Sequence, residues 1–345
     1  MPTADYVSAI RERNLSIYDS IEVGDPDLWI PAPELEELLR EGLCGLSVEG
    51  MPIKTRSKWV SQKICETLGY AVPSSFKKVR PRFLGQQFEK KVQKSNNVQI
   101  WNDEIAPSRR YVLISVSEED VVDDVKVVTG ETLAELDTTG TLTGKYQARL
   151  TLGESDSELV SSYDTSRLAP LLRESGERTA FDTRPTDYPE TGDLLPVESV
   201  FERLLPLVEM TFSDPGFNQG RERSSVVHRR ICELLGYDSY HDDGRFPDVT
   251  HQLLEVKLQT ATTIDLGIAL PSSEDPLGLP KIGDVQPRFR DVRYAILYGS
   301  ISGADVTLSH LYVMTGADFF SRFEQFGGKE LNQKIQIHLP DDFFE

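Results

Sequence analysis

The chain has 345 residues, enough for two domains, and 39% of them are apolar, which is enough to fill real cores. No run of 18 apolar residues occurs, so we expect no membrane span, and the first residues lack the basic-then-apolar order of a signal peptide. The formal net charge of −19 argues against a passive nucleic-acid binder, because like charges repel.

Cysteine usage indicates a reducing compartment. Cys44, Cys65 and Cys232 lie far apart, and they form neither a disulfide framework nor a zinc motif. The cytoplasm is therefore the expected location.

Basic residues are concentrated in one segment of this acidic chain. Eleven Lys or Arg lie between Lys54 and Lys94, against only Glu66 and Glu89. Acidic residues gather elsewhere, at 117–124, 154–158 and 173–198. The basic segment is either a solvated surface or a contact for a polyanion such as DNA.

Two of the predicted helices resemble each other. The first predicted helix covers 32–43, where apolar residues recur at helical spacing before Gly45. A second is "RSKWVSQKICETLGY", residues 56–70, and a later one is "RSSVVHRRICELLGY", residues 223–237. The last two share Arg, Ser, Val, Ile, Cys, Glu, Leu, Gly and Tyr at matching positions, which amphipathicity alone does not explain.

The similarity continues without a gap beyond these helices. Residues 80–101 align with residues 246–267, and both segments contain a Pro, a Glu-x-Lys and a Gln at matching positions. Residues 109–116 and 292–299 both read as apolar strands. We therefore expect a duplicated α+β unit, with the first copy in residues 1–150, an acidic linker in residues 151–200 and the second copy in residues 201–345.

The second copy carries three charged residues on short apolar runs, in "FPDVTHQLLEVKLQ", residues 246–259. The alternation in "LLEVKLQ" places Glu255, Lys257 and Gln259 on one face of a strand. Asp248 opens a short strand-like run, and a hairpin-like pair of strands would bring it beside Glu255; two adjacent carboxylates need a cation. Mg²⁺ is the expected ion because it takes hard oxygen ligands, and Lys257 can hold or deprotonate an attacking water. The alternative is a surface Asp beside an ordinary Glu–Lys strand face.

The order of helix, "LGY", "FPD" and "EVK" resembles the PD-(D/E)xK nuclease superfamily, which includes most type II restriction endonucleases. The resemblance covers residues 221–270, and it implies a restriction-endonuclease-like core with a central mixed β-sheet flanked by helices. It also implies that Asp248 and Glu255 bind Mg²⁺, or Mn²⁺ in its place. Lys257 would act on the water, and Glu222, early in the preceding helix, would assist with the metal.

The first copy lacks part of this set. It has Arg in place of Asp248 and Thr in place of Glu222, although it keeps Glu89 and Lys91. Without the Asp the metal site is half built, so we expect this copy to be degenerate and catalytically inactive.

A copy that does not cut can still bind DNA. Basic side chains can contact phosphates, amides in "QKSNNVQIWN" can read base edges, and Trp101 can stack. The candidate DNA contacts are Lys77, Lys78, Arg80, Arg82, Gln93, Asn96, Asn97 and Gln99 in the first copy, with Gln259, Arg288 and Arg290 in the second. The alternatives are an exposed turn and strand for the amides, a core position for Trp101, and surface salt bridges for the second-copy arginines.

Three functions fit these observations. The first is a Mg²⁺-dependent endonuclease that cuts double-stranded DNA at specific sequences, as type II restriction enzymes do in defence against foreign DNA. The second is a structure-specific repair or recombination nuclease, and the third is a non-catalytic DNA-binding or protein-interaction module. Cutting both strands needs two active sites, so a chain with one site is expected to act as a homodimer or else to nick the two strands in turn.

Overall fold

The protein is a mixed α+β structure made of two compact units. The computed structural model describes residues 4–137, 142, 145–151, 157–174, 180–213, 220–326 and 334–344, with backbone alone for residues 4, 5, 53, 54, 103 and 220–222. Unit 1 contains residues 1–143, 278–281 and 330–345, and unit 2 contains residues 144–277 and 282–329. Among the described helices, none is long and apolar enough to cross a bilayer.

These boundaries differ from those expected from the sequence. Residues 151–200 are part of unit 2, where Glu158–Leu159 pairs with Tyr312 and Val313 and where Leu171 and Leu194 are buried. The acidic residues of this range are interspersed with apolar ones that join the core, and composition alone does not reveal those contacts. The last described residues, 334–344, belong to unit 1 instead of extending the second copy.

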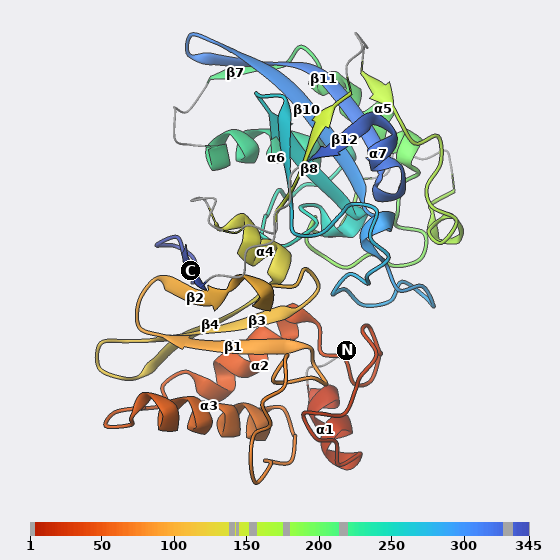
Figure 1. Ribbon diagram of the computed structural model, residues 1–345. Helices are drawn as coiled ribbons and strands as arrows, with labels where there is room; N and C mark the ends of the chain where they lie inside the picture. Colours follow the sequence, from red (N-terminus) through yellow and green to blue (C-terminus); the bar gives the residue numbers. More distant parts are fainter. Residues whose placement is uncertain are drawn as a thin grey trace. The chain divides into compact units, whose positions relative to one another are not determined.

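Unit 1 is built on a sheet of strand order β1-β3-β4, in which β1 is parallel to β3 and β3 is antiparallel to β4. Helices α2 and α3 lie along one side of this sheet (Figure 1). The elements of unit 1 are α1 Ala4–Glu12, α2 Ala32–Leu43, α3 Ile53–Thr67, β1 Phe88–Gln93, β2 Asn97–Trp101, η1 Asn102–Glu104, β3 Arg110–Val116, β4 Val122–Thr129, α4 Gly130–Glu135 and β13 Lys334–His338.

Helix α2 illustrates how the sequence places an element on the sheet. It has Glu34 in its first turn and Arg40 in its last, each favourable to the helix dipole. Leu35 and Leu39 recur at helical spacing and are fully buried. Glu36 faces the same side and accepts a hydrogen bond from the backbone of β4, which compensates for burying its carboxylate.

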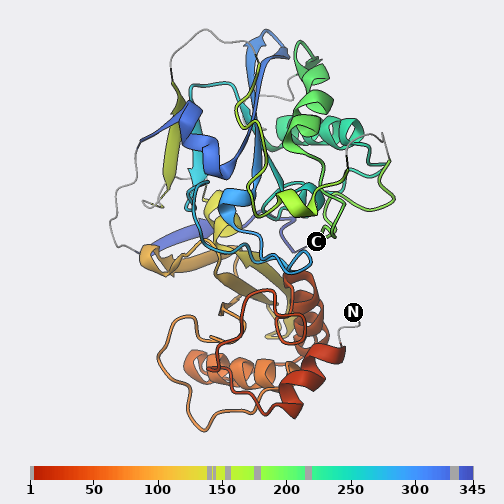
Figure 2. The same cartoon turned by 90° about the vertical axis from the view of Figure 1, so that its right-hand side faces the viewer.

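Unit 2 contains a sheet of order β6-β11-β10-β8, with β7 also paired to β11. Helices α5 and α6 cover one face of this sheet, and α7 lies on the other (Figure 2), where the ring of Phe319 packs edge-on against that of Tyr294. The elements of unit 2 are β5 Tyr146–Leu150, β6 Glu158–Leu159, η2 Ala169–Leu171, α5 Val197–Leu204, η3 Leu205–Leu207, β7 Thr211–Ser213, α6 Gly220–Leu235, η4 Thr250–Gln252, β8 Leu254–Gln259, β9 Thr263–Gly267, η5 Phe289–Asp291, β10 Arg293–Ser302, β11 Asp305–Thr315, η6 Gly316–Asp318, α7 Phe319–Arg322 and β12 Phe323–Phe326.

The two units order their first strands in the same way. In unit 1, β1 runs parallel to β3 with Phe88 opposite Arg110, and in unit 2, β8 runs parallel to β10 with Leu254 opposite Arg293. The next strand, β4 or β11, is antiparallel in each unit. Corresponding stretches of sequence therefore occupy corresponding strands with the same register.

A buried arginine supports the turn before the first strand in both units. Arg110 is fully buried and donates to the carbonyl oxygen of Gln86 at 3.1 Å. Arg293, also fully buried, donates to the carbonyl oxygen of Gln252 at 2.7 Å. Because a buried guanidinium needs acceptors for its donors, these contacts fix the turn that precedes the charged strand.

Candidate active site

A tight reversal of the chain brings Asp248 beside Glu255. The 3-10 turn η4 covers Thr250–Gln252, and Leu253 takes a left-handed φ of 46° before β8 begins. The backbone N–H of Asp248 donates to Glu255 Oε2 at 3.3 Å, and the N–H of Val256 donates to Asp248 Oδ2 at 2.9 Å. The two carboxylates that the sequence singled out are thus hydrogen-bonded into one local structure.

Lys257 extends this charged group along the same face of β8. Its Nζ lies 3.1 Å from Glu255 Oε1, and the two side chains are 14% and 4% exposed, respectively. On the opposite face, Leu254 and Val256 pack into the core beneath α5 and α6. The pair is therefore shielded, whereas an ordinary surface strand face would leave both charges in water. Gln259, next on the charged face, is half-buried.

Helix α6 lines the site with side chains that are neutral near pH 7. Burial lowers the pKa of His228 below its ordinary value, against the opposing effects of Asp242 and Glu255. Burial, followed by the charges of Asp242 and Asp248, raises the pKa of Cys232 to about 12. Cys232 Sγ lies 3.5 Å from His228 Nε2, so the two neutral groups form a contact on this helix.

The donor set fits a hard divalent cation. Mg²⁺ is typically bound through one or two carboxylates, and it keeps water or phosphate oxygens in its remaining positions. Asp248 and Glu255 supply two such carboxylates. No cluster of three or more potential His, Cys, Asp or Glu ligands occurs among the described residues. Glu222, the predicted helix carboxylate, lies in α6, but its side chain is outside the described part of the structure.

Unit 1 has Arg82 at the position where unit 2 has Asp248. Glu89 accepts a hydrogen bond from the backbone N–H of Arg82 at 2.8 Å, as Glu255 does from Asp248. Burial raises the pKa of Glu89, although Arg82 and Lys91 oppose the shift. With a guanidinium at the position that corresponds to a carboxylate of unit 2, the environment of Glu89 disfavours a divalent cation.

Lys91, the corresponding lysine of unit 1, is paired with a neighbouring acid. Lys91 Nζ lies 3.3 Å from Glu104, and Arg80 lies 2.6 Å from the same carboxylate. Lys91 and Arg80 are therefore paired with Glu104 of unit 1, whereas Lys257 of unit 2 is paired with a carboxylate of the candidate metal site.

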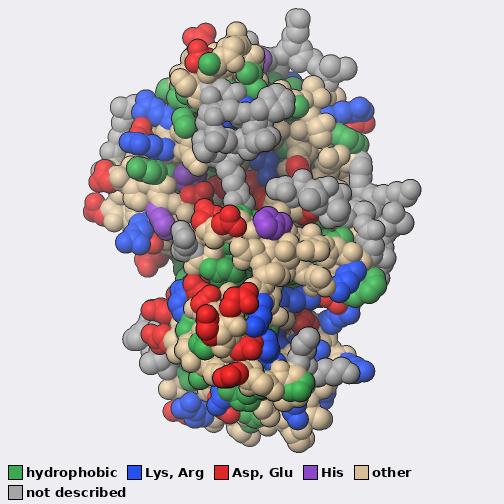
Figure 3. Space-filling model, turned by 90° about the vertical axis from the view of Figure 1, so that its left-hand side faces the viewer, with side chains coloured by type: hydrophobic (Ala, Val, Ile, Leu, Met, Phe, Trp, Pro, Cys, Tyr) green, Lys and Arg blue, Asp and Glu red, His purple; other side chains and the backbone are tan. Residues whose placement is uncertain are grey.

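The basic segment of unit 1 does not form a uniformly positive surface. Lys77 and Lys78 are exposed, but the ammonium of Lys77 lies 4.7 Å from the ring centre of Tyr18. Lys94 lies 3.1 Å from Asp120, and Arg80 is paired as described above. Figure 3 shows a face of the molecule on which acidic and basic side chains are interleaved. Arg82 is half-buried, and its guanidinium reaches the carbonyl oxygen of Lys77 at 3.5 Å.

The four amide residues predicted to contact DNA differ in burial and lie on different elements of unit 1. Gln93 ends β1, and its Nε2 is buried without a hydrogen-bond partner. Asn96 is exposed in the turn, with its Nδ2 3.5 Å from Asp341. Asn97 and Gln99 lie on β2 with Trp101, which is 45% exposed. The core position considered for Trp101 is therefore wrong.

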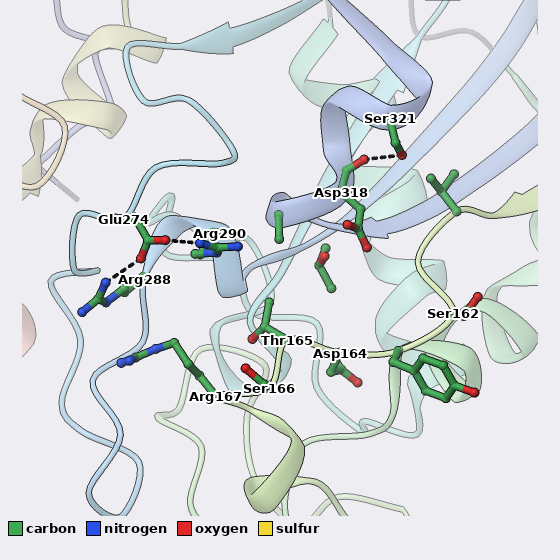
Figure 4. A pocket seen from close by; sticks show the side chains of 14 residues that line it. Ser162, Asp164, Thr165, Ser166, Arg167, Glu274, Arg288, Arg290, Asp318 and Ser321 are labelled. Atoms are coloured by element: carbon green, nitrogen blue, oxygen red, sulfur yellow. Dashed lines mark hydrogen bonds and ion pairs between the residues drawn. The ribbon is translucent and has the colours of Figure 1, made fainter.

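The unit 2 arginines follow the salt-bridge alternative. Arg288 lies 2.5 Å from Glu274, and Arg290 is bonded to the same carboxylate (Figure 4). These three residues line a cavity of about 810 Å³. Its remaining walls come from residues 160–167 and 315–321 of unit 2. The sequence does not reveal this cavity, because no local motif joins segments so far apart.

Comparison with protein-family models, with curated proteins and with solved structures finds no match for this chain.

Proposed function

We propose that this protein is a Mg²⁺-dependent endonuclease that hydrolyses phosphodiester bonds in double-stranded DNA. The observation that carries the proposal is the shielded group of Asp248, Glu255 and Lys257, in which two carboxylates and an amine are held by one turn and one strand. A structural ion pair would need Glu255 and Lys257 alone. The additional carboxylate is what a metal-dependent hydrolase requires.

Asp248 and Glu255 would hold the cation, which when bound neutralises charge on the scissile phosphate and lowers the pKa of water. The backbone hydrogen bonds at Asp248 and Val256 keep both carboxylates in place before the ion arrives. Lys257, beside Glu255, would orient the attacking water or take its proton. The water oxygen then attacks phosphorus, and the bond to the leaving sugar oxygen breaks.

We also propose that unit 1 is a degenerate copy of unit 2 and that the core of each is restriction-endonuclease-like. The shared strand order, the shared register and the buried arginines Arg110 and Arg293 at matching positions support a common origin. A copy that retains its fold without the second carboxylate is free to specialise in binding DNA. This favours a site-specific restriction enzyme that acts as a homodimer over a repair nuclease.

The test is cleavage of plasmid and phage DNA by purified variants. Asp248→Asn, Glu255→Gln and Lys257→Met are each expected to abolish cutting in Mg²⁺ or Mn²⁺ while DNA binding persists. Glu89→Gln in unit 1 is the matched control, because it alters the corresponding strand residue without touching the proposed site. If any of the three unit 2 variants cuts at the wild-type rate, the assignment of the site is wrong.

A further inference from the structure

Strand β2 forms a two-stranded sheet with β13, a strand from the other end of the chain. β13 runs antiparallel to β2 with Gln336 opposite Gln99, and Figures 1 and 2 both show the two strands side by side. The side chains of this β2–β13 ribbon alternate strictly. Val98, Ile100, Ile335 and Ile337 are buried. The opposite face carries Asn97, Gln99 and Trp101 from β2 and Lys334, Gln336 and His338 from β13.

This outward face has an unusual composition for the chain. The protein has 56 Asp and Glu against 37 Lys and Arg, yet none of the six outward residues is acidic. The cross-strand pairs are amide with amide, Asn97 with His338 and Trp101 with Lys334. His338 Nδ1 lies 3.3 Å from Asn97 Oδ1. Among the acids near this ribbon, Asp341 contacts Asn96 in the adjoining turn, and Glu104, three residues beyond Trp101, is paired with Arg80 and Lys91. The six outward side chains therefore combine hydrogen-bonding groups and a positive charge, and none of them is a carboxylate that would repel a polyanion.

The dimensions of the β2–β13 ribbon match the major groove of DNA. Two strands lie about 4.8 Å apart, and three alternate side chains span about 14 Å along a strand. The major groove is about 12 Å wide and admits a two-stranded ribbon, and at about 3.4 Å per base pair this length covers about four base pairs. Amides can pair with adenine through a donor and an acceptor, and lysine can bind the acceptors of guanine.

We propose that the β2–β13 ribbon enters the major groove of double-stranded DNA and that β13 contributes to its recognition residues, through Lys334 and Gln336. This deepens the proposed function, on which it rests, by assigning sequence recognition to residues about 240 positions away from the amide-rich segment of unit 1. Since β13 belongs to unit 1 by its pairing, the recognition surface is a property of that unit alone.

The experiment measures sequence preference by selection of bound DNA from a randomised duplex library, using the full chain in EDTA so that no cutting is required. Gln336→Ala and Lys334→Ala are each expected to lower the preference at one base-pair position by about 5- to 150-fold. Melting temperatures should stay close to wild type because both side chains are exposed. Gln147→Ala is the matched control, since Gln147 lies on β5 opposite Asp265 of β9, the strand that aligns with β2. The Gln147→Ala variant should select the same DNA sequences as the wild type.

The outcomes separate the inference from the proposed function. Unchanged selected sequences with both Gln336→Ala and Lys334→Ala overturn the role of β13, even if the wild type binds and cuts DNA. Binding without any sequence preference in the wild type also overturns it. A wild-type chain that binds no DNA overturns the inference and the proposed function together, and a site-specific binder that never cuts contradicts the nuclease alone.

Discussion

Replacement of Lys257 by Met is expected to make the stability of the protein depend on Mg²⁺. Removing one partner of a buried ion pair costs about 3–5 kcal/mol, because the other charge is left behind. Glu255 is 4% exposed and Lys257 14% exposed, and the N–H of Asp248 still donates to Glu255, so we take the lower end, about 3 kcal/mol. For a domain of this size, that lowers the melting temperature by about 6–12 °C in EDTA.

Mg²⁺ should restore most of this loss by replacing the missing positive charge. A ligand at a hundred times its dissociation constant stabilises the folded state by about 2.7 kcal/mol. The shift should exceed that of the wild type, in which Lys257 competes for Glu255, and it should vanish when Asp248→Asn is added. The assay is thermal unfolding in a Mg²⁺ titration.

Lys91→Met in unit 1 is the control for this experiment. Glu104 keeps Arg80 at 2.6 Å after Lys91 is removed, so the expected loss is below about 1 kcal/mol and should not respond to Mg²⁺. An unchanged melting temperature for Lys257→Met in EDTA, or an equal Mg²⁺ shift in both variants, would refute the reasoning.

Two further predictions concern buried charges. Arg293→Met should destabilise unit 2 by about 3–5 kcal/mol in urea unfolding, because Asp164, 2.6 Å away and 1% exposed, loses its partner. Adding Asp164→Leu should recover part of this loss. Strictly additive effects of the two substitutions would contradict the coupling. Burial, then Arg82, lowers the pKa of Lys90 from 10.5 to about 8, so its contribution makes the wild type more stable as pH rises from 8 to 10.5. Lys90→Val should therefore be more stable than the wild type at pH 7 and lose most of that advantage by pH 10; a constant difference across this range would count against the burial of an ammonium.

Local patterns in the sequence were sufficient for the elements that carry the proposed catalytic group. The helix predicted over 32–43 is α2, and α3 and α6 lie within a few residues of the two helices predicted from their similarity. The strand alternation around Glu255 was sufficient to place Lys257 on its face, since side chains on a strand alternate with a period of two. The proximity of Asp248 and Glu255 was also expected, but from a hairpin-like pair of strands; the structure achieves it with the 3-10 turn Thr250–Gln252 and the left-handed Leu253, which had no distinctive sequence signal.

Contacts between distant segments could not be predicted in this way. The pairing of β13 with β2 joins residues about 240 positions apart, and a five-residue alternating strand has no signal for its partner. The ion pair of Arg293 with Asp164 places a charge of the expected linker in the core of unit 2. The acidic composition of residues 151–200 predicted a linker, because composition reflects the many charges and not the few apolar residues that are buried in unit 2.

The most direct measurement is a digestion of phage DNA by the purified wild-type chain, in Mg²⁺ and in EDTA, with the products separated by size. We expect a reproducible set of discrete fragments in Mg²⁺ and intact DNA in EDTA, because a Mg²⁺-dependent site cuts at the sequences that unit 1 selects. Intact DNA in both conditions would contradict the assignment of Asp248, Glu255 and Lys257 as a nuclease site. A continuous smear would retain the nuclease and contradict its sequence specificity.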